Sequence, residues 1–524
     1  MITSPQTLGH ALRRNLPYGP LVFLLIWEIA ARAFSDAFVL AGPLAVSVYL
    51  FDNFGLIARA LGVTLANAAF GFFIGNAAAI GLAVLAVLLP RGEAMIRGFA
   101  LWVFCLPLVA TGPLLRVFFG PGEWPQIILA ALAVYYTTLI PLLFGLRAVP
   151  SGWLDLSRSY GRGRFSALVH IRAMAAVPYL VAGLQIAAPA AFLGAMVGEF
   201  TGAERGMGVL TIRALRGMNI EMTWALATVA TSVAVLAYAA IGKIAEQILA
   251  EDPPTILAAP ALPSQHGMWS ALTQGICVTL GVLVVWWGGL WLSGLNPFFA
   301  KGPDDVFEAL FTASDAETTR AALYTALGET AIYLLPGYMF GLFAGAGLAM
   351  LLILLPSLAN TAMPLAIALR SVPIITTAPL VVLLLGRGAV GTMTLVAIMV
   401  FFPTFVACLH GLKQAPGRVM DVFNSYAASP WDKLLRVRIP AMLPAFFAAA
   451  RINVPASVLA VTVVEWLATG NGIGSVMALS ASLSNYDMLW SSVVLVALLA
   501  VMGYLAVGAV EKAILRVYAP EQLS

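Results

Sequence analysis

The sequence predicts an all-α integral membrane protein of about 12 transmembrane helices, arranged as two six-helix repeats with the same orientation. Three observations lead to this prediction. Of the 524 residues, 61% are hydrophobic and 10% are charged, against about 45 to 50% and about 25% in soluble domains. Apolar runs of about 20 residues, the length of a membrane-spanning helix, recur along the chain. The same pattern of residues also occurs twice.

The apolar runs are continuous and do not alternate with polar residues, which excludes a membrane barrel and leaves helices. In the first copy they lie near residues 18–36, 60–89, 98–119, 125–147, 179–200 and 223–249. In the second copy they lie near residues 272–294, 326–355, 362–385, 390–412, 445–467 and 488–514. The first run follows a basic start but precedes no small-residue cleavage site, so we expect a retained span.

The two copies are separated by a constant offset of 266 residues. Matching pairs include Thr64 and Thr330, Pro107 and Pro373, Asp155 and Asp421, Glu199 and Glu465, and Trp224 and Trp490. We therefore predict one six-span repeat at 1–250, a Pro-rich linker at 251–269 and a second six-span repeat at 270–524. Because each copy has an even number of spans, both have the same orientation, and a pseudo-twofold axis lies along the membrane normal.

Lys and Arg gather near both termini and in the loops after the second and fourth spans of the first copy. The loop after the fourth span of the second copy repeats this bias. Since short cytoplasmic loops carry an excess of cations, we expect these loops and both termini to be cytoplasmic. Three arginines on the opposite side oppose the rule, namely Arg205, Arg213 and Arg216.

Charged amphipathic segments interrupt the apolar sequence between the fourth and fifth spans, within loops at about 150–178 and 416–444. Apolar residues at helical spacing with a central break predict two short helices joined by a bend beneath the bilayer. An amphipathic helix on lipid headgroups is the alternative. Asp155 and Asp421 argue against it, because an anionic lipid surface gives no reason for an acid there, whereas a protein partner does.

These loops resemble a motif in the permease subunits of bacterial ATP-binding-cassette (ABC) importers. The motif is Glu-Ala-Ala, three residues, Gly, nine residues, Ile, one residue, Leu-Pro. Asp155, Gly161 and Ile171 occupy the Glu, Gly and Ile positions in the first copy, and Asp421 and Val437 occupy the Glu and Ile positions in the second. Both alanine pairs of the motif are replaced, by Leu156-Ser157 and Val422-Phe423, and Ala427 replaces the second Gly.

Two further segments narrow the resemblance. ALRSVPIITTAPLVVLLLGRG at 368–388 and VVEWLATGNGIGSVM at 463–477 are similar to the nitrate, sulfonate and taurine permease group, and their first-copy counterparts share the same skeleton. The chain thus resembles a fused pair of type I ABC importer permeases of a bacterial cytoplasmic (inner) membrane. Such subunits are usually separate six-span chains that dimerise.

The resemblance implies that a coupling helix in each loop sits in a groove of a cytoplasmic ATPase. The coupling residues would be Asp155, Leu156, Tyr160, Gly161, Asp421, Val422, Phe423, Tyr426 and Ala427. It further implies two ABC ATPase subunits, expected as a homodimer, which bind ATP and Mg²⁺, and a periplasmic or lipid-anchored solute-binding protein. Membrane lipid surrounds the chain, and the net charge of +4 gives no reason to expect a nucleic-acid partner.

No catalytic, cofactor or metal site is expected in this chain. The phosphate-binding pattern GxxxxGK[ST] is absent, so ATP hydrolysis is assigned to another subunit. The four histidines have no ligand spacing, and the three cysteines lie in apolar sequence without a CxxC pair.

Glu199 and Glu465 end the fifth span of each copy, before a Gly-rich stretch. An ionisable group beside apolar sequence is a candidate functional site, so both could flank the pathway or its gate. The alternative is that each caps a helix or accepts backbone N–H groups of the following turn.

The other pathway candidates lie in the third span of each copy. Arg370, whose counterpart is Phe104, either binds an anionic substrate or anchors its helix at the interface, and we favour the anchor. Prolines here either kink water-facing helices or reflect ordinary tolerance of proline in membrane helices. The remaining candidates are Pro107, Pro373, Thr111, Thr376 and Thr377.

We expect an ATP-driven importer of a small organic or inorganic anion such as a sulfonate, taurine or nitrate, as the resemblance implies. An importer of a thiamine-precursor pyrimidine or another heterocycle is a second reading. A secondary transporter with parallel six-helix repeats is a third, although such proteins usually place the signature loop between the second and third spans. A non-transporting membrane scaffold or sensor is a fourth.

Overall fold

The computed structural model describes residues 18–33, 40–249, 268–355, 381, 384–386 and 388–518. In this part of the chain, every regular element is a helix. Nine of the helices described there are long and apolar enough to cross a membrane, and the bent pair α5 (Glu93–Phe104) and α6 (Leu108–Phe119) forms a tenth if counted as one span. The chain is therefore an all-α membrane protein. Most of the run predicted near 362–385 lies outside the described residues.

The helices follow the chain in the order that the repeat predicts, with short π-helices labelled η. The first copy contains α2 (Tyr18–Ala33), α3 (Pro43–Asp52), α4 (Phe54–Leu88), α5, α6, α7 (Trp124–Arg147), α8 (Ser151–Ser159), α9 (Arg164–Ala167), η2 (Leu168–Arg172), α10 (Ala173–Phe200), α11 (Met207–Arg216) and α12 (Ile220–Ile248). The second contains α13 (Met268–Ser293), α14 (Pro303–Phe307), η3 (Glu308–Thr312), α15 (Ala316–Leu354), α18 (Ala389–Lys413), α19 (Gly417–Ser425), α20 (Pro430–Lys433), η4 (Leu434–Arg438), α21 (Ile439–Val464), η5 (Glu465–Thr469), α22 (Ile473–Ser482) and α23 (Tyr486–Tyr518).

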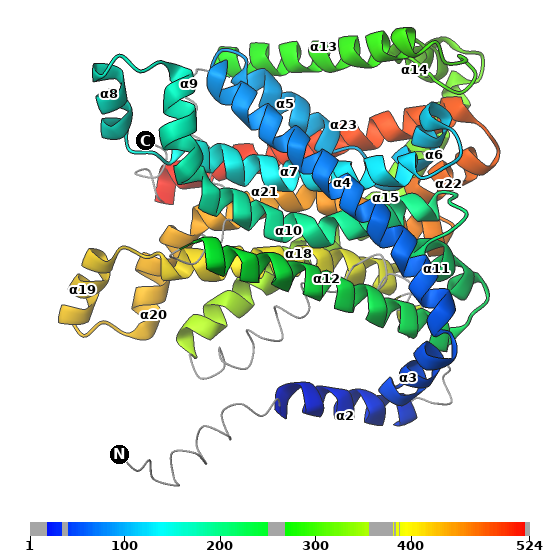
Figure 1. Ribbon diagram of the computed structural model, residues 1–524, viewed down its shortest axis with the longest axis horizontal. Helices are drawn as coiled ribbons and strands as arrows, with labels where there is room; N and C mark the ends of the chain where they lie inside the picture. The colour runs from blue at the N-terminus through cyan, green and yellow to red at the C-terminus, as the bar shows by residue number, and fades with distance from the viewer. Residues whose placement is uncertain are drawn as a thin grey trace.

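The two copies have the same orientation. In Figure 1, α8 and α9 project from the left end of the helix bundle, and α19 and α20 project from that same end. The short helices α11 and α22 both lie at the opposite, right-hand end. We call these ends the loop end and the far end.

Small residues bring the long helices of each copy close together. In the first copy, a Cβ on Gly71 of α4 would collide with Ala130 of α7. In the second, a Cβ on Gly337 of α15 would collide with the carbonyl of Met393 in α18. Membrane helices associate through such close packing, because lipid supplies no hydrophobic force between them. The repeated glycines therefore fix the same helix pair in both copies.

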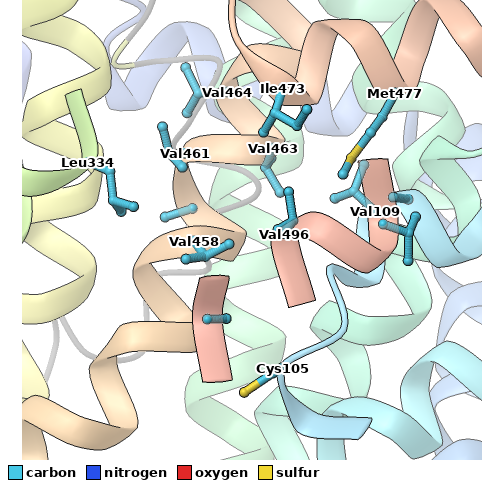
Figure 2. Close-up of a cluster of buried hydrophobic side chains, with 14 of the residues drawn as sticks. Cys105, Val109, Leu334, Val458, Val461, Val463, Val464, Ile473, Met477 and Val496 are labelled. Atoms are coloured by element: carbon cyan, nitrogen blue, oxygen red, sulfur yellow. The ribbon is translucent and has the colours of Figure 1, made fainter. Parts of the chain in front are cut away.

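The copies share one hydrophobic core. Figure 2 shows part of it: Cys105 and Val109 of the first copy belong to the same buried cluster as Val458, Val463 and Met477 of the second. The copies thus form one packed unit within the described residues.

The first span of the second copy also lies against the first copy. A Cβ on Gly98 of α5 would meet the side chain of Val278 in α13. The helix α6 in turn contacts α21, α22 and α23. Helices of one copy therefore cover those of the other.

Two expectations need correction. The run at 98–119 is not one continuous helix: α5 and α6 meet at an angle of 96° around Cys105-Leu106-Pro107. The reason is that proline has no N–H to donate and disfavours helical geometry in the residue before it. A neighbouring proline, Pro113, lies inside α6 without ending it.

The second correction concerns the projecting loops. Their second helices are not separate short helices, because α9 and α20 continue through η2 and η4 into the fifth spans, as single helices from Arg164 to Phe200 and from Pro430 to Leu467. No Gly or Pro lies between Gly163 and Pro178, so nothing ends the first of these helices after it begins. The second half of each loop is therefore continuous with the fifth span.

Candidate functional site

Each projecting loop begins with a nine-residue helix that ends in the same turn. The backbone N–H groups of Arg162 and Ala428 each donate to a carbonyl five residues earlier, at 3.1 and 3.0 Å. Gly161 and Ala427 occupy the left-handed region of backbone conformation, with φ of +69° and +49°. Glycine adopts this region freely and alanine only at a cost. The second copy therefore has the same left-handed turn as the first, although alanine replaces glycine at that position.

The loops present matching rows of exposed apolar side chains. Among the predicted coupling residues, Leu156 and Val422 are exposed, and Tyr160 and Tyr426 are 77% and 82% exposed, whereas Phe423 is half-buried. Three further exposed pairs, related by the 266-residue offset but not among the predicted coupling residues, extend the rows: Trp153 with Val419, Phe165 with Trp431, and Val169 with Leu435. We call these rows the coupling surfaces.

The predicted acids lie beside the coupling surfaces. Asp155 and Asp421 are both exposed, and Asp155 forms an ion pair with Arg158 at 2.9 Å. The helices α8 and α19 that carry these residues project beyond the long helices (Figure 1). Exposed apolar patches of this kind, with charges around them, are typical of protein contact sites.

A second constellation surrounds Glu199 at the far end. Glu199 is 1% exposed. Thr64 Oγ1 donates to Glu199 Oε1 at 2.7 Å, and the N–H of Gly208 donates to Oε2 at 2.7 Å. The N–H of Met207 donates to Thr64 Oγ1 at 2.8 Å. The carboxylate therefore joins α4, the end of α10 and the N-terminus of α11, where a negative charge is favourable.

Glu465 makes the same junction in the second copy, also at 1% exposure. Here Thr330 Oγ1 and the N–H of Gly474 both donate to Oε2, at 3.0 and 2.9 Å. The N–H of Ile473 donates to Thr330 Oγ1 at 3.0 Å. Within the described residues, Glu465 Oε1 accepts no hydrogen bond. The threonines were part of the repeat, but their role as partners of the acids was not anticipated.

Glycines are required beside both acids. Gly206 and Gly472 have φ of +126° and +84°. A Cβ on either glycine would collide with the carboxyl group of Glu199 or Glu465. The turn after each fifth span therefore closes directly over its carboxylate.

The other described pathway candidates lie on α6 or at its start, and Gly112 of α6 packs against Thr201, two residues from Glu199. Thr111 is buried, with its hydroxyl donating to the carbonyl of Leu108 at 2.9 Å, and Pro107 begins α6 at the bend. Phe104, the counterpart of Arg370, stacks on Tyr136 at 4.1 Å between ring centroids. The remaining candidates lie outside the described residues: Arg370, Pro373, Thr376 and Thr377. Among the residues that are described, no group of three His, Cys, Asp or Glu side chains could hold a metal ion.

The second copy also has a buried ion pair that the first lacks. Arg451 of α21 lies 3.2 Å from Glu511 of α23, and both side chains are largely buried. At the corresponding positions the first copy has Gln185 and Ala245. This pair could therefore make the second copy differ from the first in function or in stability.

Two like-oriented membrane copies with paired projecting loops define a duplicated transport permease. The chain belongs to the family of binding-protein-dependent transport system inner membrane components, which matches residues 71–251 and 324–516. Members are non-enzymatic membrane subunits of ABC transporters that work with a separate ATPase and a substrate-binding protein. The protein is thus a multi-pass component of the inner membrane.

Curated relatives are about half as long as this chain. A probable ABC transporter permease protein of Haemophilus influenzae is 29% identical over 42% of the chain and 90% of its own length. The formylaminopyrimidine transport permease protein ThiX of Halalkalibacterium halodurans is 25% identical over 44% of the chain and 92% of its own length. The putative aliphatic sulfonates transport permease protein SsuC of Escherichia coli is 25% identical over 43% and 84%. Each corresponds in size to one copy.

Proposed function

We propose that this single chain supplies both halves of the transmembrane pathway of one ATP-driven importer. Its two copies would be residues 1–250 and 270–524, joined by the linker 251–269. The observation that carries the proposal is the pair of coupling surfaces, which are exposed, apolar, related by the repeat, and attached to continuous helices that form the fifth spans.

Each coupling surface seats one cytoplasmic ATPase, which binds ATP and Mg²⁺ itself. Closure of the two ATPases moves α8 and α19, and because α9 and α20 run without a break into the fifth spans, the two copies rock as rigid bodies. The loop end and both chain termini are cytoplasmic in this scheme, in agreement with the excess of cations there. The far end receives solute from a periplasmic or lipid-anchored binding protein.

The solute that we propose is a small organic or inorganic anion of the sulfonate, taurine or nitrate type. The aliphatic sulfonates relative supports it. A heterocycle such as a pyrimidine is the second candidate, supported by the formylaminopyrimidine relative.

Uptake into liposomes tests the transport proposal. Proteoliposomes that contain the chain, its cognate ATPase and its binding protein should accumulate solute only with ATP. Tyr160→Asp with Tyr426→Asp should lower uptake at least tenfold, because a charge at the centre of an apolar contact must be desolvated without a partner. Tyr518→Ala is the matched control, since Tyr518 is 65% exposed and ends α23 at the loop end.

Two results would refute the proposal. Uptake driven by an ion gradient without the ATPase would support a secondary transporter. Binding of the ATPase without uptake of any solute offered by the binding protein would support a scaffold or sensor.

A further inference from the structure

A cavity of about 840 Å³ opens at the far end of the second copy, between α15, η5 and α22. Two carboxylates line it, those of Glu329 and Glu465, together with polar groups of Asn471 and Ser475. Among the described residues that line this cavity, none is Lys, Arg or His. The cavity therefore carries negative charge that no lining cation neutralises.

The two acids meet at one backbone position. The N–H of Gly472 donates to Glu329 Oε2 at 2.8 Å, and the same glycine lies directly against the carboxyl group of Glu465. Glu465 Oε1 is the buried oxygen that accepts no hydrogen bond from any described residue. A buried acceptor without a hydrogen-bond partner is unfavourable, and more so when it is charged. The cavity is the side from which a donor outside the chain could approach this carboxyl group, because Glu465 is among the residues that line it.

The first copy provides an internal control. Val63 stands where the second copy has Glu329, and Arg205 stands where it has Asn471. Both oxygens of Glu199 accept hydrogen bonds, from Thr64 and Gly208. The glutamate junction forms in both copies, so the fold does not require the second acid or the free oxygen. These two features are specific to the second copy.

We propose that this cavity binds the ammonium group of a small organic cation or zwitterion. An ammonium group offers three N–H donors, which match the carboxylate of Glu329, the carboxyl group of Glu465 and a neutral oxygen of Asn471 or Ser475. The cavity is far larger than the roughly 30 Å³ of one water molecule, so the ammonium group has room to carry an organic substituent. This site goes beyond the proposed transport function, because binding requires neither ATP nor an ATPase.

Binding to the purified full chain in phosphatidylcholine nanodiscs tests the site. The probe is n-propylammonium chloride, followed by calorimetry and by the fluorescence of Trp466, which lines the cavity. Trp466→Phe identifies this signal among the 12 tryptophans. We expect saturable binding of propylammonium and none of sodium propionate.

The control variants copy the first repeat. Glu329→Val and Asn471→Arg should each weaken binding at least tenfold, the first by removing an acid and the second by placing a guanidinium in the cavity. A thermal unfolding midpoint close to that of the parent shows that each variant is folded, and Ser482→Ala, at the rim, should bind normally.

Three outcomes overturn the proposal. The first is that the parent chain shows no saturable binding. The second is that folded Glu329→Val binds as tightly as the parent. The third is that Na⁺ or Ca²⁺ at the probe concentration displaces propylammonium completely, which would indicate an inorganic cation site.

Discussion

The two copies agree at the projecting loops and at the glutamate junctions, and they differ in what surrounds those junctions. Tyr160 and Tyr426 are equally placed, as are the bonds from Thr64 and Thr330 to their acids. By contrast, the second copy has an acid-lined cavity at its far end, and the first copy has Val63 and Arg205 at the positions of Glu329 and Asn471. We expect the features that both copies keep to serve the movement of the two halves, and the exposed features that differ to serve contact with solute or partner.

The largest effect should come from filling the space beside a shared acid. Gly472→Ala should lower the free energy of unfolding by about 4 kcal/mol, because a left-handed backbone and a steric collision add. Gly206→Ala should do the same in the first copy, since the junctions agree. Gly470→Ala is the control: its φ is +76°, but a Cβ there meets nothing within 4 Å. Thermal unfolding in detergent measures the stability of all three variants. Equal losses of stability for Gly470→Ala and Gly472→Ala would contradict a steric collision at Gly472.

The buried ion pair that only the second copy has should give the next largest effect. Glu511→Ala leaves Arg451 buried without its partner and should cost about 3 kcal/mol. The double variant Arg451→Gln with Glu511→Ala reproduces the first-copy residues, so it should regain most of that loss. Unfolding midpoints of the two variants provide the measurement. If the double variant is no more stable than the single one, the pair does not act as a unit.

Amide substitution should distinguish the two acids themselves. Glu199→Gln replaces one of two accepting oxygens by a donor and should cost about 2 kcal/mol. Glu465→Gln can place its NH₂ group at the free Oε1 position and keep both hydrogen bonds on the remaining oxygen, so it should cost less than about 1 kcal/mol. The same unfolding assay compares them. Equal costs would show that the difference in hydrogen bonding between the copies is unimportant.

The smallest effect should come from the turn at the end of each coupling helix. Ala427→Gly relieves a left-handed alanine and should stabilise the chain by about 1 kcal/mol, whereas Gly161→Ala should destabilise it by about 1 kcal/mol. The two substitutions should therefore change the free energy of unfolding in opposite directions. Hydrogen exchange of α8 and α19 measures it locally, and two changes of the same sign would exclude the turn strain inferred from φ.

Much of the fold could be predicted because membrane spans and repeats leave strong patterns in sequence. Apolar runs locate the helices, and the constant offset of the repeat is enough to pair Glu199 with Glu465. The sequence left open whether Pro107 interrupts its helix, because membrane helices often tolerate proline, as α6 does at Pro113. Whether a proline bends or breaks a helix depends on tertiary packing.

The site was predicted less completely than the fold. Exposed loop residues such as Tyr426 could be found because their helical spacing is local. The bond between Thr64 and Glu199 joins residues 135 positions apart, so only the folded chain reveals it. The difference between Glu329 and Val63 is visible in the sequence, but it gains meaning only beside the free oxygen of Glu465.

The central claim is that each half of this one chain seats one ATPase through an equivalent coupling surface. Cross-linking tests it directly. Cys277 is exposed and is first replaced by serine, whereas Cys105 and Cys408 are buried and stay. Tyr160→Cys and Tyr426→Cys, each treated with a thiol-reactive cross-linker in membranes that contain the ATPase, should each capture one ATPase subunit, and the double variant should capture two. Capture by only one of the two positions, or by neither, would contradict the claim.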